Sequence, residues 1–131
     1  MSADLYQIRN FKHKPSTKQT IKFLATCSDP KVQRVVLNSA NDSVFKSICN
    51  AFLNLAENPQ IQVSPNHTKL IARHSPRIRR LLSTKVPIRK KKVLIQKGGS
   101  LFLGTVLPMV ISSALSFLGT RFLSSAKHVR K

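Results

Sequence analysis

The sequence predicts an all-α fold: a small helical bundle, followed by a basic helical segment and an apolar C-terminal helix. Two observations lead to this prediction. Apolar residues recur at helical spacing over residues 17–84, with short breaks that contain Pro, Asn or Asp. No stretch shows the two-residue alternation expected of a half-buried strand. A chain of 131 residues is one domain by length, with room for appended segments.

The first two helices are predicted on either side of a break at residues 28–30. The first begins at Thr17, after a flexible basic arm at residues 1–16, and its apolar residues share one side: Ile21, Phe23, Leu24 and Cys27. Asp29 followed by Pro30 is a start signal, because Asp caps free amide groups and proline fits the first helical position. The second helix carries Val32, Val35, Val36 and Ala40.

Two further helices complete the predicted bundle. The break at Asn41-Asp42-Ser43 opens the clearest amphipathic helix, whose apolar residues are Val44, Phe45, Ile48, Cys49, Phe52, Leu53 and Ala56. Asn58-Pro59 ends that helix, and Ser64-Pro65 opens the next one, which is broken at Ser75-Pro76 and then resumes. This last helix carries Leu70, Ile71, Ile78, Leu81 and Leu82. The apolar faces between residues 21 and 82 can bury one another, so a helical bundle is expected over residues 17–84.

Positive charge is concentrated in the second half of the chain. The protein has 23 Lys and Arg against 4 acids, a net charge of +19, and every acid lies within the first 57 residues. Residues 58–131 hold 15 of the cations and no acid. Because a charge of one sign repels itself in a compact chain, the expected partner is a polyanion or an anionic membrane surface.

The densest basic stretch is the candidate nucleic-acid site. It holds Lys69, Arg73, Arg77, Arg79, Arg80, Lys85, Arg89, Lys90, Lys91, Lys92 and Lys97. On a helix, Lys69, Arg73, Arg77 and Arg80 would line one side. Such cations neutralise phosphates and release counterions, although a merely solvated face is the alternative. With no clear helix-turn-helix and one tyrosine for stacking, binding of double-stranded DNA without sequence specificity is expected.

The basic linker at residues 85–99 ends in Gly98-Gly99, and an apolar tail helix with a basic end is predicted over residues 100–131. Residues 101–118 carry no charge, and as a helix they would span ~27 Å, close to the ~30 Å of a bilayer core. On a helical wheel the hydroxyl residues between Thr105 and Ser124 share one arc. Three interpretations follow: a membrane span, an interfacial helix flanked by cations, or a helix packed against the bundle.

Catalysis is not expected from this sequence. The four histidines, His13, His67, His74 and His128, have no metal-binding spacing, and the second half offers no acid to orient them. No phosphate-binding glycine loop is present, because Gly98-Gly99 precedes an apolar run. We therefore expect no cofactor and no metal. Cys27 and Cys49 fall in apolar helical patterns, which predicts buried thiols of a reducing compartment.

The junction of the basic and apolar segments resembles adenovirus protein X, the family of precursors of the core peptide mu. The residues that carry the resemblance are Arg89–Lys92, Lys97-Gly98-Gly99, Leu101–Leu103 and Val106–Ile111. The wider pattern over residues 21–118 is similar to small proteins of Maverick or polinton elements and of adintoviruses. The family's basic part is short and arginine-dense, whereas here a helical region precedes the junction.

The resemblance implies a virion core protein that condenses double-stranded DNA in the virion and the host nucleus. Other virion proteins and a viral cysteine protease would be its partners, and an anionic membrane would be a further one. The protease would cut after Gly99, before Ser100, although Gln96 departs from the aliphatic residue of the family's site. Glycines suit a narrow protease slot, but they equally suit a helix cap. A small tail-anchored or membrane-active protein that binds anionic lipid is the alternative function.

Overall fold

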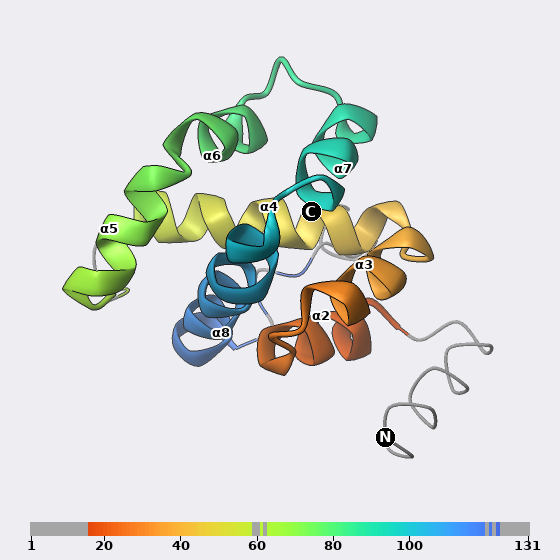
Figure 1. The fold of residues 1–131 in the computed structure, drawn as a ribbon, viewed down its shortest axis with the longest axis horizontal. Helices are drawn as coiled ribbons and strands as arrows, with labels where there is room; N and C mark the ends of the chain where they lie inside the picture. The colour runs from red at the N-terminus through yellow and green to blue at the C-terminus, as the bar shows by residue number, and fades with distance from the viewer. Residues whose placement is uncertain (1–15, 59–60, 62, 120, 122, 124–131) are drawn as a thin grey trace.

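The computed structural model describes residues 16–58, 61, 63–119, 121 and 123 (Figure 1). All regular structure in these residues is helical, which confirms the all-α prediction. The α-helices are α2 (Thr17–Thr26), α3 (Pro30–Asn38), α4 (Asp42–Glu57), α5 (Pro65–Arg73), α6 (Ser75–Leu82), α7 (Ile88–Gln96) and α8 (Leu107–Leu118). A π-helix, η2 (Phe102–Val106), leads directly into α8. Apart from Ser16, the basic arm predicted at residues 1–16 lies outside the described residues.

Side-chain caps begin the helices at the predicted breaks. The Ser16 hydroxyl accepts a hydrogen bond from the Gln19 amide, and the Gln19 side chain accepts one from the Ser16 amide, which forms a capping box. The Asp29 carboxylate accepts from the Lys31 amide, and Pro30 occupies the first turn of α3. Asn41 and Ser64 cap α4 and α5 in the same way, on the amides of Val44 and His67. The breaks in the pattern therefore fix where these helices start.

Helix α4 is the central element of the fold. In Figure 1 it crosses the middle of the molecule, with α6 and α7 above it and with α2 and α8 below it. It packs against all four of these helices, α2 packs against α8, and α6 packs against α7. Its buried side chains include Phe45, Ile48 and Phe52, which are at most 2% exposed. The long amphipathic helix thus lies between α6 and α7 on one side and α2 and α8 on the other.

The apolar segment after Gly99 forms the other half of the core. Helix α8 packs against α2 and α4, and η2 packs against α3 and α5. Its side chains at positions facing these helices are 0–1% exposed: Phe102, Leu103, Val106, Leu107, Val110, Ile111 and Ala114. Burial of a large apolar side chain contributes roughly 1.5–3 kcal/mol, so this segment is a principal source of stability. Residues 102–118 are therefore integral to the bundle.

The π-helix η2 accommodates a proline inside a continuous helical segment. Pro108 has no amide hydrogen, and in a regular α-helix its ring would clash with the carbonyl of Gly104. The turn before it is widened instead, and the Leu107 amide donates to the carbonyl of Phe102. Gly104 brings this turn close to the start of α3, because a Cβ there would lie 3.0 Å from the Ser28 carbonyl oxygen.

Of the three interpretations of the tail, its burial agrees with packing against the bundle. No helix among the described residues is long and apolar enough to cross a bilayer. The predicted hydroxyl arc is divided: the Ser112 hydroxyl donates to the Ala25 carbonyl of α2 at 2.9 Å, whereas Ser116 is exposed. That bond satisfies one of the free carbonyls at the end of α2. The basic end at residues 124–131 lies outside the described residues.

Candidate nucleic-acid interface

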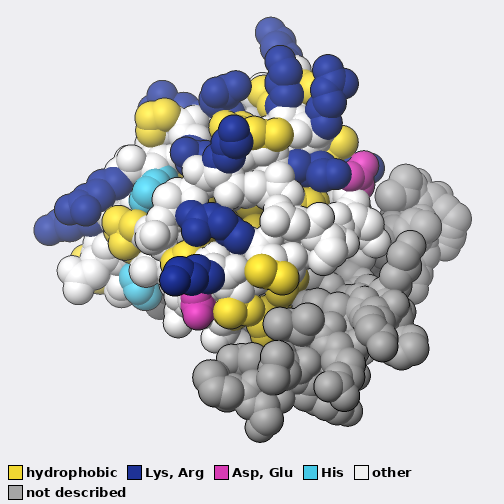
Figure 2. Space-filling model, turned by 45° about the vertical axis from the view of Figure 1, so that its right-hand side comes forward, with side chains coloured by type: hydrophobic (Ala, Val, Ile, Leu, Met, Phe, Trp, Pro, Cys, Tyr) yellow, Lys and Arg dark blue, Asp and Glu magenta, His cyan; other side chains and the backbone are white. Residues whose placement is uncertain are grey.

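The cations of the predicted nucleic-acid site lie on one layer of the fold. Helices α5, α6 and α7, with the connection at residues 83–87, are here called the basic layer. Lys and Arg side chains stand along the upper edge of the molecule in Figure 2, where α6 and α7 lie, and at its left, where α5 lies. No acid occurs in residues 58–131, so the basic layer has no carboxylate of its own.

Most of these side chains are exposed to solvent. The exposed ones are Lys69, Arg73, Arg79, Arg80, Lys85, Arg89, Lys90 and Lys97. They extend from α5 through the connection at residues 83–87 to the end of α7. An exposed ammonium or guanidinium without a carboxylate neighbour is available to a phosphate, and contact with a phosphate would release the counterions around it. The remaining three cations, Arg77, Lys91 and Lys92, are half-buried and have different surroundings.

Arg77 points into the fold and connects α6 to the next helix. Its guanidinium donates to the carbonyl of Leu94 in the last turn of α7, and it lies 5.5 Å from the centre of the Phe102 ring. A cation is favoured at the end of a helix, where backbone carbonyls lack partners, and it is also attracted to an aromatic face. The single cationic side predicted for Lys69, Arg73, Arg77 and Arg80 is therefore interrupted at Arg77.

Lys92 connects α7 to the start of α4. Its ammonium lies 3.0 Å from a carboxylate oxygen of Asp42 and 5.4 Å from the centre of the Phe45 ring. The two charged side chains are 31% and 55% exposed, so the attraction is screened by water and is worth at most about 1 kcal/mol. This contact assigns Lys92 a role in attaching the basic layer to the bundle.

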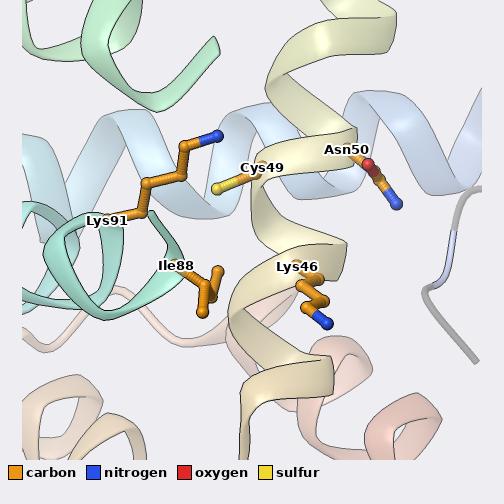
Figure 3. Close-up of a pocket in the computed structure, with 5 residues that line it drawn as sticks. All are labelled: Lys46, Cys49, Asn50, Ile88 and Lys91. Carbon is orange, nitrogen blue, oxygen red and sulfur yellow. The ribbon is translucent and has the colours of Figure 1, made fainter. Parts of the chain in front are cut away.

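Lys91 borders a hollow between α4 and α7. The hollow has a volume of about 340 Å³ and is lined by Lys46, Cys49 and Asn50 of α4 and by Ile88 and Lys91 of α7 (Figure 3). The Cys49 side chain points toward that of Lys91. Burial raises the pKa of the Cys49 thiol to about 11, and the Lys91 charge only partly offsets this. The thiol is therefore protonated at neutral pH and is a poor nucleophile.

His74 marks the bend between α5 and α6. It is half-buried, and its Nε2 atom is out of contact with water and has no hydrogen-bond partner among the described residues. Its ring lies 5.5 Å from that of Phe102, tilted by 57°. Burial, followed by the charges of Arg77 and Arg73, lowers its pKa below the ordinary value of 6.5. The neutral ring suits this mixed aromatic and cationic environment.

The Gly-Gly junction lies at a boundary between helices. Helix α7 ends at Gln96, and the Leu103 amide donates to the Gly99 carbonyl, so the next helical segment starts directly after Gly99. Gly98 is buried, its amide donates to Ile95, and its carbonyl accepts a bond of 3.4 Å from Arg34. Gly99 and Ser100 are exposed. In the candidate protease site, Gly98 is therefore buried in the fold, whereas Gly99 and Ser100 are accessible to solvent.

The two thiols differ in their surroundings: both are reduced, Cys49 is buried, and Cys27 is half-buried. Within the described residues, His, Cys, Asp and Glu do not gather in threes as a metal site would require. The sequence pattern does not indicate Lys46, because this lysine is isolated from other cations along the chain and is brought to α7 only by the packing of α4.

Comparison of the chain with models of protein families, with curated proteins and with solved structures finds no match.

Proposed function

We propose that this chain is a non-enzymatic DNA-packaging protein that binds and condenses double-stranded DNA without sequence specificity. The observation that carries the proposal is the basic layer, where eight exposed cations lie on three consecutive helices and in the residues that connect or follow them, and residues 58–131 contain no acid. Charges of one sign held so close repel one another, and a polyanion relieves this repulsion. Phosphate groups of a duplex are the ligand that suits a broad, exposed cationic surface.

The proposal includes a place in a virion core. The resemblance of the junction to the adenovirus protein X family, and of the longer pattern to polinton and adintovirus proteins, supports a genome-condensing role in the virion and host nucleus. Other virion proteins and a viral cysteine protease would then be partners, the latter at Gly98-Gly99 and Ser100. This part of the proposal rests on residues 89–111, which carry the family-like features.

Binding to an anionic membrane is the less favoured function. Stable anchoring requires an apolar helix or acyl chain in addition to a polybasic patch. In this fold the side chains of Phe102, Leu107 and Ile111 are completely buried, so the apolar face that they form is not available to lipid unless the bundle opens. The basic layer alone would give weak, salt-sensitive attraction to lipid headgroups.

A salt titration of duplex binding tests the proposed function. The full chain is titrated with two labelled duplexes of equal length and unrelated sequence, and the dissociation constant is followed by fluorescence anisotropy at several salt concentrations. We expect equal affinities and a log–log salt slope of roughly 0.9 per phosphate contacted. Absence of binding at low salt, or affinity indifferent to salt, would refute the proposal.

Two triple variants with the same change of charge provide the matched control. One removes three exposed cations of the basic layer by Arg80→Gln, Lys85→Gln and Lys90→Gln. The other removes three exposed cations of α2 and α3 by Lys18→Gln, Lys22→Gln and Lys31→Gln. If the basic layer binds the phosphates, the first variant should lower the salt slope by up to about 3 and the second should change it much less.

A further inference from the structure

The hollow between α4 and α7 brings together Lys91, one of the eleven predicted cations, and Lys46, which lies outside the predicted basic stretch. Its lining includes Lys46 and Asn50 of α4 and Lys91 of α7. No acid lines it. The nearest acid of α4 along the chain, Asp42, pairs with Lys92, and among the described residues neither Lys46 nor Lys91 pairs with a carboxylate. Two lysines whose charges are not paired with a carboxylate among the described residues therefore line one surface depression.

The lining of the hollow combines cationic and apolar chemistry. Ile88 and Cys49 lie between the two lysines in Figure 3, and Cys49 is a protonated, buried thiol. A volume of about 340 Å³ is far above the ~30 Å³ that one water takes up in the liquid, so the hollow has more room than a single phosphate needs. An anion that also carries a less polar group fits this lining better than a free inorganic ion does. A sugar–phosphate unit of a nucleic-acid backbone has this composition.

Lys46 has the freedom to take part in such a contact. Its side chain is exposed, and Figure 3 shows its ammonium directed away from Ile88. The four-carbon stem of lysine rotates readily, so the ammonium can swing toward a phosphate at the rim of the hollow. Lys91 is half-buried and more restricted, and it would provide the fixed side of the site.

We infer that this hollow holds one backbone phosphate of bound duplex DNA between Lys46 and Lys91, with the adjoining sugar against Ile88 and Cys49. The inference rests on the proposed function and extends it, because the bound DNA would contact α4 as well as the basic layer. Lys46 thereby becomes a nucleic-acid contact outside the basic stretch of the sequence. Lys91, which faces Cys49 and the hollow, contacts the DNA from the side of α7.

Substitution of Lys46 tests the inference in the full chain. Lys46→Gln should lower the log–log salt slope for duplex binding by about 1 and weaken binding alike for unrelated sequences. Lys22→Gln, which removes an exposed cation from α2, should leave the slope unchanged, and Lys46→Arg should retain it. Acetylation of lysines followed by mass spectrometry should show that the duplex protects Lys46 and Lys91 but leaves Lys22 reactive.

The outcomes separate the inference from the proposed function. If the wild-type chain binds duplex with a steep salt dependence but Lys46→Gln behaves like Lys22→Gln, the phosphate site is wrong and the proposed function stands. Equal acetylation of Lys46 with and without duplex would lead to the same conclusion. If the wild-type chain does not bind duplex at low salt, both proposals fall together.

Discussion

Gly98 and Gly99 are adjacent residues of the same type, but the fold constrains them differently. A Cβ added to Gly98 would lie 2.4 Å from Cδ2 of Phe102, whereas a Cβ on Gly99 would have no atom within 4 Å. The Phe102 ring cannot move aside easily, since it is completely buried and stacks on Phe52 with a centroid separation of 5.9 Å. Gly98 is thus required by packing, and Gly99 is not.

This difference predicts that alanine substitution destabilises the fold at Gly98 but not at Gly99. Gly98→Ala should lower the free energy of unfolding by about 1–3 kcal/mol, because it overpacks the site of Phe102. Gly99→Ala should change it by less than about 0.5 kcal/mol, as is usual at exposed positions. Urea denaturation followed by circular dichroism measures both. Equal stabilities of the two variants would contradict the packing role of Gly98. If a protease reads Gly99, Gly99→Ala would block the cut without disturbing the fold.

His74 makes stability depend on pH. The pKa of the folded chain's imidazole lies below its ordinary value of 6.5, so the unfolded chain takes up the proton first as pH falls. Stability due to the neutral ring is complete above about pH 6.5 and is lost as pH falls from there toward the lower pKa of the folded state. We expect the free energy of unfolding to decrease over this window, and His74→Gln to flatten the decrease.

Urea denaturation at a series of pH values, at constant ionic strength, measures this effect of His74. The series should stop above about pH 5, where carboxylates begin to titrate. His67→Gln, at the other end of α5, is the matched control and should keep the wild-type dependence. A wild-type slope in the His74→Gln variant would assign the pH dependence to other groups.

Helices α6 and α7 are connected by an arginine that the charge pattern alone assigns to DNA binding. Arg77 donates to the Leu94 carbonyl of α7 and contacts the Phe102 ring, whereas Arg79, two residues later, is exposed. The two arginines therefore allow the structural use of a cation to be separated from its use in binding.

Arg77→Gln and Arg79→Gln should affect different measurements. Arg77→Gln leaves the Leu94 carbonyl without its donor and removes the cation–π contact, so it should lower the free energy of unfolding by roughly 1–3 kcal/mol. Arg79→Gln should change it by less than about 0.5 kcal/mol but should lower the salt slope of duplex binding by about 1. Thermal unfolding and anisotropy titrations measure the two effects. The reverse result would show that Arg79 supports the fold.

The helix boundaries were predictable because they depend on local chemistry. Asp29-Pro30, Asn41 and Ser64-Pro65 offer capping oxygens or proline at the first turn, and these are features of a few neighbouring residues. The basic layer was predictable as a set of residues, but not the directions of its side chains. Arg77 and Lys92 face inward because of Leu94, Phe102, Asp42 and Phe45, and Lys46 nears Lys91 only through the packing of α4 on α7.

The packing of the whole molecule was the hardest feature to predict. An uncharged run such as residues 101–118 has the same composition whether it enters a bilayer or a protein core. The choice depends on whether α2 and α4 leave a matching apolar face, which is a property of their assembly. That face exists, and α8 occupies it.

A chain that ends at Gly99 should therefore fail to fold. It lacks seven core side chains that are at most 1% exposed, and their loss removes roughly 10 kcal/mol or more, comparable to the total stability of a small domain. We expect no cooperative urea transition and greatly reduced helical circular dichroism for this truncated chain. The full chain cut after Gly99, with both pieces present, is the control and should keep the transition if the pieces stay packed. Cooperative unfolding of the truncated chain would show that α2–α7 form a bundle of their own.

The position of the π-helix and α8 along the chain affects how the protein folds during its synthesis. A ribosome makes the other described core helices before residues 102–118, so α2 and α4 leave the exit tunnel before the segment that packs against them. Domains fold as units, and their exposed apolar surface promotes aggregation in the interim. The nascent basic helices, already outside and strongly charged, would keep neighbouring nascent chains apart by repulsion until the last core segment arrives.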